Sequence, residues 1–284
     1  MGSTDYNFES RAVRTNNYVS QDFNETFTQQ EVRRVHESMD SKAISFRESR
    51  DSDVHPETFP IIIALDVTGS MGHIPHYIIK HGLPLIVEAL MKAGIKSPAI
   101  LFMAIGDHEC DRHPLQIGQF ESGDQELDMW LTRTYIESGG GGNAGESYSL
   151  AHYFAATRCQ TDSFDKRNKK GVLITVGDEP NLKNYPSTAM NGIFHGNDNP
   201  SFTEGEAVDL ARQQWEPFHI LPRVDNRGAG NHWRELLGNE NVITAQGQEA
   251  VAQAIIDIVV NCYGVKSQGT QSQETQSDTP EEIL

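Results

Sequence analysis

Residues 59–72 of the chain read FPIIIALDVTGSMG, an apolar run that ends in a loop of acidic and hydroxyl side chains. A continuous apolar run predicts a strand that is buried on both faces of a sheet. Similar runs at 99–105 and 171–176 predict two more such strands, and residues 74–91 show apolar side chains at helical spacing. Buried strands that alternate with helices predict an α/β fold: a Rossmann-like, doubly wound and mainly parallel sheet flanked by helices.

Shorter patterns complete the predicted domain, which we place at residues 57–264. They indicate strands at 115–120, 217–221 and 241–244, and helices at 125–134, 146–157, 204–214, 233–237 and 248–260. The helix at 74–91 is expected to be disturbed at Pro84, which has no backbone N–H to donate.

Two segments of different composition flank the domain. Residues 1–56 are polar with scattered Tyr and Phe, so we interpret them as an extended N-terminal arm with one short helix at 28–39. Residues 265–284 are rich in Ser, Gln and Thr, and this low-complexity composition predicts a disordered tail because it offers too little to bury.

Composition argues against several classes of protein. The 284 residues include 40 Asp and Glu against 23 Lys and Arg, a net charge of −17, which disfavours nucleic acid as a partner. The three cysteines form no CxxC pair, a usage typical of a reducing compartment. No apolar run is long enough to span a bilayer, and the first thirty residues hold no apolar signal-peptide core. We therefore expect a cytoplasmic protein with no membrane partner.

Polar residues follow the predicted strands in positions that suit a cation. Asp66, Thr68 and Ser70 alternate along a tight loop, so their oxygens can point at a common centre. A Gly-rich loop at 138–147 and Gly177-Asp178-Glu179 come later, and ligands of α/β sheets sit beyond the carboxyl ends of strands. Carboxylate and hydroxyl oxygens suit Mg²⁺ or Mn²⁺ better than zinc. The alternative is that these residues only form turns and helix caps.

Together these features resemble the von Willebrand factor A domain and its metal-ion-dependent adhesion site (MIDAS). The resemblance rests on DVTGSMG after an apolar strand, a Gly-rich second loop and an Asp after a later strand, and it covers nearly all of the predicted domain. It implies a cation, Mg²⁺ or else Mn²⁺ or Ca²⁺, that Asp66 holds through water and that hydroxyls coordinate directly. The implied metal ligands are Asp66, Thr68, Ser70, Asp178 and, from the second loop, Glu146 or, as second choice, Asn143.

The same resemblance implies a function. In that family an open coordination position is filled by a carboxylate of a protein partner, which indicates a protein-binding module and not an enzyme. Intracellular bacterial and phage proteins that resemble it often serve larger machines, including AAA+ ATPases. We therefore expect a protein partner that presents Asp or Glu, and no nucleic acid.

A catalytic alternative comes from a different family. Asp66-Val67-Thr68-Gly69-Ser70 also resembles the Asp-Lys-Thr-Gly-Thr of the haloacid dehalogenase superfamily, which implies a Mg²⁺-dependent phosphohydrolase with Asp66 as nucleophile. Asp178 would then hold magnesium and Lys169 or Lys170 the phosphate. Against it, Thr68 stands where soluble phosphatases usually carry an acid, and the Gly-rich loop has no role.

Other motifs have plainer interpretations. We interpret Asp107–His113 as a solvated acidic loop in which Asp107 holds backbone amides, with a supporting role beside the ion or a separate metal site as alternatives. His73 and His76 are expected to be capping or surface residues, and 166–170 a solvated basic hairpin. The three Trp residues are expected to pack in the core.

Overall fold

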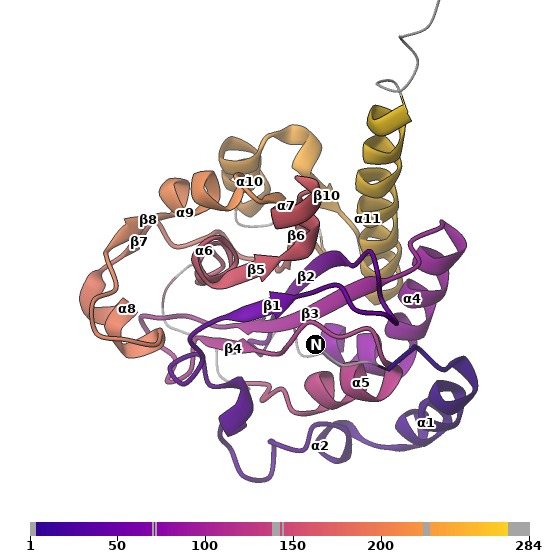
Figure 1. The fold of residues 1–284 in the computed structure, drawn as a ribbon. Coiled ribbons are helices and arrows are strands. Elements are labelled where there is room, and N and C mark those ends of the chain that lie inside the picture. The colour runs from indigo at the N-terminus through magenta and orange to yellow at the C-terminus, as the bar shows by residue number, and fades with distance from the viewer. Residues whose placement is uncertain are drawn as a thin grey trace, which may run out of the picture.

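The fold is built on one six-stranded sheet. The computed structural model describes residues 4–69, 71, 73–137, 143, 145–223 and 228–271. The strand order is β10-β9-β6-β2-β3-β4, and every neighbouring pair is parallel except β3 and β4 (Figure 1). This confirms the predicted α/β class. The strands are β2 (Phe59–Asp66), β3 (Pro98–Ile105), β4 (Leu115–Ile117), β6 (Gly171–Val176), β9 (Trp215–Leu221) and β10 (Val242–Thr244).

Helices cover both faces because both faces of the central strands are apolar. Along β2, Ile61 and Ile63 pack into one buried cluster while Ile62 and Ala64 pack into another. The first cluster includes side chains of α3 (His73–Tyr77), α4 (Leu83–Lys92), α5 (Asp124–Thr132) and α11 (Gln248–Gln271). The second includes side chains of α6 (Ser149–Arg158), α8 (Ser187–Ile193), α9 (Glu204–Ala211) and α10 (Ala229–Leu237).

The helix predicted at 74–91 is interrupted, as expected from its proline. A π-helical turn at Ile78–Gly82 separates α3 from α4, and Pro84 lies in the first turn of α4. Because Pro84 has no N–H, a regular α-helical hydrogen bond cannot form at that residue, and the wider turn absorbs the change.

The N-terminal segment packs on its own chain. It contains α1 (Phe8–Ser20) and α2 (Phe23–Thr26), which we did not predict. The fully buried side chain of Arg11 pairs with Asp128 of α5 at 3.0 Å, so α1 is held against the domain. The helix predicted at 28–39 is wrong: the segment forms turns and a 3₁₀-helix, Glu37–Met39, because it follows the surface of α5.

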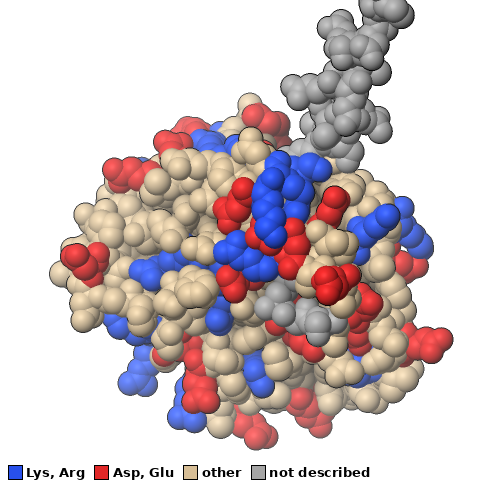
Figure 2. Space-filling model, viewed as in Figure 1, with Lys and Arg blue, Asp and Glu red and all other residues tan. Residues whose placement is uncertain are grey.

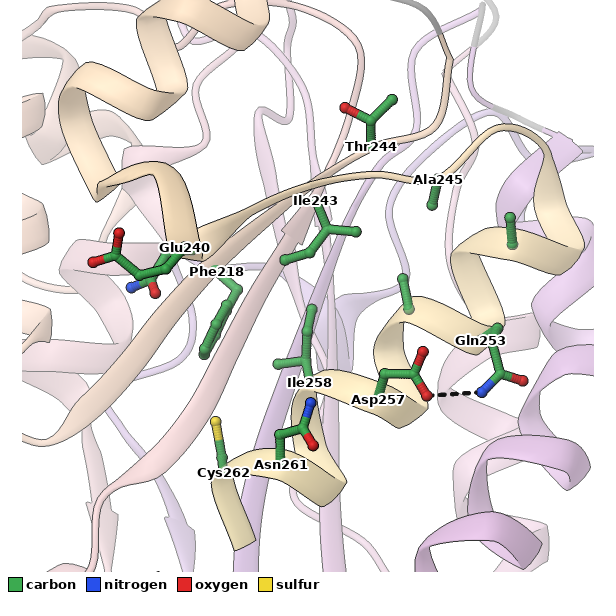
Figure 3. A pocket seen from close by; sticks show the side chains of 13 residues that line it. Phe218, Glu240, Ile243, Thr244, Ala245, Gln253, Asp257, Ile258, Asn261 and Cys262 are labelled. Atoms are coloured by element: carbon green, nitrogen blue, oxygen red, sulfur yellow. Dashed lines mark hydrogen bonds between the residues drawn. The ribbon is translucent and has the colours of Figure 1, made fainter. Parts of the chain in front are cut away.

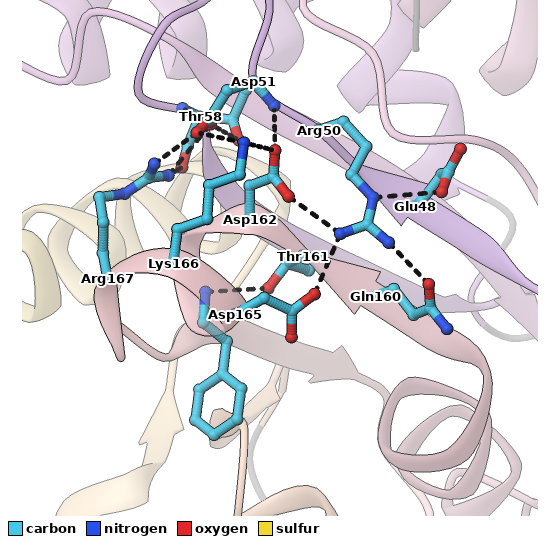
Figure 4. A network of polar contacts seen from close by, with 11 residues as sticks. Glu48, Arg50, Asp51, Thr58, Gln160, Thr161, Asp162, Asp165, Lys166 and Arg167 are labelled. Atoms are coloured by element: carbon cyan, nitrogen blue, oxygen red, sulfur yellow. Dashed lines mark hydrogen bonds and ion pairs between the residues drawn. The ribbon is translucent and has the colours of Figure 1, made fainter.

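The same segment adds a strand outside the main sheet. Strand β1 (Arg47–Ser49) pairs in parallel with β5 (Cys159–Thr161), just before α7 (Asp162–Arg167). The hairpin predicted at 166–170 is wrong, because Lys166 and Arg167 belong to α7 and form ion pairs with Asp162 and Asp51 (Figure 4). Two smaller strands, β7 (Asn184–Tyr185) and β8 (Phe202–Thr203), and a 3₁₀-helix, Asn239–Asn241, complete the fold.

The C-terminal helix is longer than predicted. Figure 1 shows α11 leaving the body of the domain at its C-terminal end, where it continues to Gln271. Residues 272–284, most of the predicted tail, lie outside the described residues. Within the described part of the chain, every helix is too short or too polar to cross a membrane.

Charges of both signs are interspersed over the surface. On the face drawn in Figure 2, the largest group of Lys and Arg lies near the centre and is bordered by Asp and Glu. Although the chain carries a net charge of −17, positive side chains therefore neutralise part of the acidic surface on this face.

Candidate metal centre

Three adjacent strands end side by side with an acidic residue each. Asp66 is the last residue of β2, Asp178 lies two residues after β6, and Asp107 lies two residues after β3. Because β2 pairs with both β6 and β3 in parallel, these ends share one edge of the sheet, with Asp66 in the middle. The adjacency of β2 and β6, on which the predicted site depends, is confirmed.

The segment before α6 crosses over these strand ends and brings in Glu146. The Glu146 N–H donates to the carbonyl of Pro180 at 3.0 Å, and the Ser147 N–H donates to the carbonyl of Gly106 at 3.0 Å. Pro180 follows β6 and Gly106 follows β3, and β2 lies between these two strands. The segment with Glu146 therefore crosses the end of β2. The prediction that helix begins at 146 is wrong, because this residue pairs with Asn181 and α6 starts at Ser149.

Asp66 is fully buried and organises its own loop. Its Oδ1 accepts hydrogen bonds from the Thr68 N–H at 2.8 Å and from the Thr68 hydroxyl at 2.6 Å. A hydroxyl that donates its proton to a carboxylate keeps its lone pairs for another partner, such as a cation. Burial raises the pKa of Asp66, the hydrogen bonds from Thr68 and Tyr148 lower it, and the charge of Asp178 raises it, to about 6.

Tyr148 is a partner of Asp66 that the sequence did not reveal. Its hydroxyl donates to Asp66 Oδ2 at 2.8 Å, and its ring meets His219 and Trp233 edge to face. Gly177 makes room for it, since a Cβ there would lie 1.8 Å from the Tyr148 hydroxyl. The sequence carries no signal for this contact beyond the position of Tyr148 close to Glu146.

The two candidates from the Gly-rich loop differ in their surroundings. Glu146 is 6% exposed, and among the described residues its buried Oε2 has no hydrogen-bond partner. Burial, followed by the charges of Asp66, Asp111 and Asp107, raises the pKa of Glu146 to about 9. Asn143 instead donates from Nδ2 to Oε2 of Glu109 at 3.0 Å in an exposed position. Ser70 lies outside the described residues.

Asp178 has a cationic neighbour that we did not predict. Nε of Arg223 lies 3.0 Å from Asp178 Oδ2, and Arg223 follows the end of β9, the strand next to β6. The negative charge of Asp178 is therefore offset within the protein.

The loop at Asp107–His113 matches only half of its predicted description. Asp107 Oδ1 accepts the Glu109 N–H at 2.8 Å, as expected of a turn residue. However, Asp107 is fully buried instead of solvated, because the segment before α6 packs on this loop: the Ser147 hydroxyl accepts the His108 N–H at 2.8 Å. Within the described part of the chain, Asp107 Oδ2 has no hydrogen-bond partner.

The centre gathers buried carboxylates that lack a countercharge. We call Asp66, Asp107 and Glu146 the unpaired acids, because among the described residues no Lys, Arg or His lies within ion-pair distance of them. We call Asp124, Asp128 and Asp162 the paired acids, because each is equally buried but forms ion pairs with Arg or Lys.

Such a set fits a hard cation. Buried charges in proteins are normally paired or bound to metal. Within the described residues, no three His, Cys, Asp or Glu side chains are close enough together to hold an ion by themselves. An ion here would therefore also need neutral oxygen ligands, such as the Thr68 hydroxyl and water, which suits Mg²⁺, Mn²⁺ or Ca²⁺ and not zinc.

The structure places the two lysines that the phosphohydrolase alternative requires away from Asp66. Lys169 and Lys170 precede β6, whereas Asp66 ends the parallel neighbour β2, so the two groups lie at opposite edges of the sheet. The Lys170 ammonium donates to the carbonyl of Arg212 at 2.6 Å instead. That assignment of the lysines is wrong.

The remaining predicted residues lie away from the centre. His73 is exposed, and the ring of the partly buried His76 packs against Phe23 at 5.4 Å. All three Trp side chains are buried, as predicted. A separate groove of about 620 Å³ lies between α11 and β10; Figure 3 shows Phe218 and Ile258 lining it and Gln253 donating to Asp257 at its rim. None of the predicted site residues lines this groove.

Comparisons with known proteins find distant likeness to solved structures. No protein-family model matches the sequence, and no curated protein matches it. The pilus adhesin SpaC of Lactobacillus rhamnosus GG, in its open conformation, is 10% identical over 76% of this chain and 31% of SpaC, with a TM-score of 0.48. Proximal thread matrix protein 1 from the mussel byssus, with a zinc-occupied MIDAS motif, is 10% identical over 76% of this chain and 49% of that protein, with a TM-score of 0.47. The chain thus spans less than half of either structure, and a likeness this distant carries no functional conclusion.

Proposed function

We propose that the chain is a divalent-cation-dependent protein-binding module, whose ion captures an Asp or Glu side chain of a partner protein. One observation carries this proposal: at the edge of the sheet where β2, β3 and β6 end, there are three buried carboxylates without a countercharge among the residues that the structure describes. Within α/β folds this edge is where ligands bind.

The residues proposed to hold the ion are those of the loop after β2 and of the two loops beside it. Asp66 and Thr68 already share a hydrogen bond that leaves the hydroxyl lone pairs available. Ser70, Glu146 and Asp178 complete the proposed set, with Asn143 as the second choice in the Gly-rich loop. A bound divalent ion supplies positive charge and an open coordination position for a carboxylate.

The charge of the chain makes the ion a condition for binding. With a net charge of −17 and unpaired acids at the site, an acidic partner group is repelled in the absence of the ion. Binding of such a partner should therefore depend on the cation, which acts as a switch.

The proposal is tested in two steps. Thermal unfolding in EDTA is compared with unfolding in Mg²⁺, Mn²⁺ or Ca²⁺, for the wild type and for Asp66→Asn. We expect the cation to raise the melting temperature of the wild type only. A partner is then sought by capture from the native host with and without EDTA.

Equal cation responses of wild type and Asp66→Asn would refute the site. Partners that are retained equally with and without EDTA would refute the role of the ion in binding. Glu240→Gln is the control, because Glu240 is an exposed acid before β10, at the opposite edge of the sheet, and it should respond like the wild type.

A further inference from the structure

Asp107 stands beside the candidate centre but belongs to none of the loops from which the ligands were predicted. It follows β3 and precedes the antiparallel strand β4. In the sheet, the end of β2 lies between the ends of β3 and β6, so Asp107 and Asp178 flank Asp66 on opposite sides.

The turn that Asp107 forms does not explain its charge. Its Oδ1 accepts the Glu109 N–H, and the Asp107 N–H in turn donates to Asp111 Oδ2 at 2.7 Å. An Asn or Ser side chain would accept the same amide bond without a charge. The second oxygen of Asp107 is buried and, among the described residues, has no hydrogen-bond partner. A buried carboxylate oxygen without a partner is unfavourable, because burial removes the water that would otherwise solvate it.

The two acids that flank Asp66 differ in whether a positive charge lies beside them. On the β6 side, Arg223 lies 3.0 Å from Asp178 and offsets its charge. On the β3 side, Asp111 accepts the Asp107 N–H, and among the described residues no Lys, Arg or His forms an ion pair with Asp107. The uncompensated negative charge of the centre is therefore concentrated on the β3 side.

We infer that Asp107 is a further residue of the cation centre, which supplies negative charge to the ion from the β3 side, directly or through water. This inference rests on the proposed cation site.

The test measures binding of Mg²⁺ and Mn²⁺ alone to the full chain by titration calorimetry. We expect Asp107→Asn to weaken the binding at least about tenfold, in the range known for groups that support metal ligands. Asn can keep the bond to the Glu109 N–H, so the unfolding temperature in EDTA should not fall. Asp107→Ser, which can also accept that bond, should lose cation affinity in the same way and guards against a variant that fails to fold.

Two controls separate this inference from the proposed function. Asp66→Asn, which removes a proposed ligand, should weaken binding at least as much as Asp107→Asn does, and Glu240→Gln, which removes an exposed charge before β10 at the opposite edge of the sheet, should have almost no effect. A wild type that binds no cation refutes the proposed function. A wild type that binds the cation, together with Asp107 variants of unchanged affinity, refutes this inference alone.

Discussion

Two sets of buried acids in this protein look alike in the sequence and differ in what surrounds them. The paired acids hold the N-terminal segment to the domain. Figure 4 shows one example, in which Asp162 accepts from Arg50 at 2.9 Å, from Lys166 at 2.7 Å and from the Asp51 N–H at 2.9 Å. Of the unpaired acids at the end of the sheet, Asp66 and Asp107 accept hydrogen bonds, but within the described part of the chain none of the three forms an ion pair.

The charges around a buried acid indicate whether it has a structural role or binds a ligand. Both sets are acidic, both are buried and both join segments far apart in the sequence. A set that the chain neutralises by itself has a structural role that its own contacts explain. A set that the chain leaves charged needs an ion from outside, or must take up protons.

The largest expected effect comes from removing the buried cation that pairs with Asp128. Arg11→Ala leaves Asp128, which is 2% exposed, with the more exposed Arg14 alone. We expect a loss of about 3–5 kcal/mol in the free energy of unfolding, the usual cost of breaking a buried ion pair from one side. Urea denaturation measures this loss. The double variant Arg11→Ala/Asp128→Ala should recover part of it, and no recovery would contradict the assignment of Asp128 as a paired acid.

The opposite change at an unpaired acid should stabilise the ion-free protein. In Glu146→Gln a neutral amide replaces a side chain whose charged form burial disfavours. We expect a gain of about 1–3 kcal/mol at neutral pH in EDTA, the range for a buried polar group relieved of its penalty. The same variant should lose its response to Mg²⁺. A variant that is less stable than the wild type in EDTA would show that Glu146 is already compensated.

One acid of each set, Asp162 and Glu146, should respond to pH in opposite directions, whereas burial raises the pKa of the paired acid Asp128 in spite of its ion pairs. Although burial raises the pKa of Asp162, hydrogen bonds from Lys166, the Asp51 N–H and Arg50 lower it to about 2, so its contribution to stability is present above about pH 3.8 and lost as the pH falls toward 2. The pKa of Glu146 is raised from 4.5 to about 9, so stability is greatest below pH 4.5 and is lost as the pH rises toward 9.

Denaturation in EDTA across this pH range measures how the free energy of unfolding falls at acid pH (the acid limb) and at alkaline pH (the alkaline limb). Asp162→Asn should flatten the acid limb only, and Glu146→Gln the alkaline limb only. If both variants change the same limb, the distinction between paired and unpaired acids is not the cause of the pH dependence.

The smallest expected effect concerns the hydrogen bond from Tyr148 to Asp66. Tyr148→Phe removes one buried donor and keeps the ring contacts with His219 and Trp233. We expect a loss of about 1 kcal/mol in unfolding free energy, the typical value of one hydrogen bond, and a change in cation affinity of a few fold. An affinity change as large as that of Asp66→Asn would instead make Tyr148 an essential part of the centre.

The sequence predicted what depends on local pattern and missed what depends on distant partners. The buried strands β2, β3 and β6 are uninterrupted apolar runs, so both their existence and the meeting of their carboxyl ends could be predicted. The strand pair β1–β5 is only three residues long in each strand and has no apolar run. The docking of α1 depends on buried ion pairs with α5, which no local pattern reveals.

The residues of the candidate centre also fall into those that local sequence patterns predicted and those that they did not. Asp66, Thr68 and Asp178 could be placed from strand ends and spacing. Arg223 and Tyr148 could not, because each reaches the centre from an element whose position only the folded sheet defines. The burial of Asp107 likewise follows from packing against the segment before α6, so its sequence context indicated a solvated loop.

The amount of cation bound per chain decides most directly whether the unpaired acids form a metal centre. Equilibrium dialysis against Mn²⁺, followed by electron paramagnetic resonance of the free ion, measures it for the wild type, Asp66→Asn and Glu146→Gln. If the unpaired acids hold a cation, the wild type should bind one Mn²⁺ that Mg²⁺ displaces, and both variants should bind far less. A wild type that binds none, or variants that bind as much as the wild type, would contradict the claim.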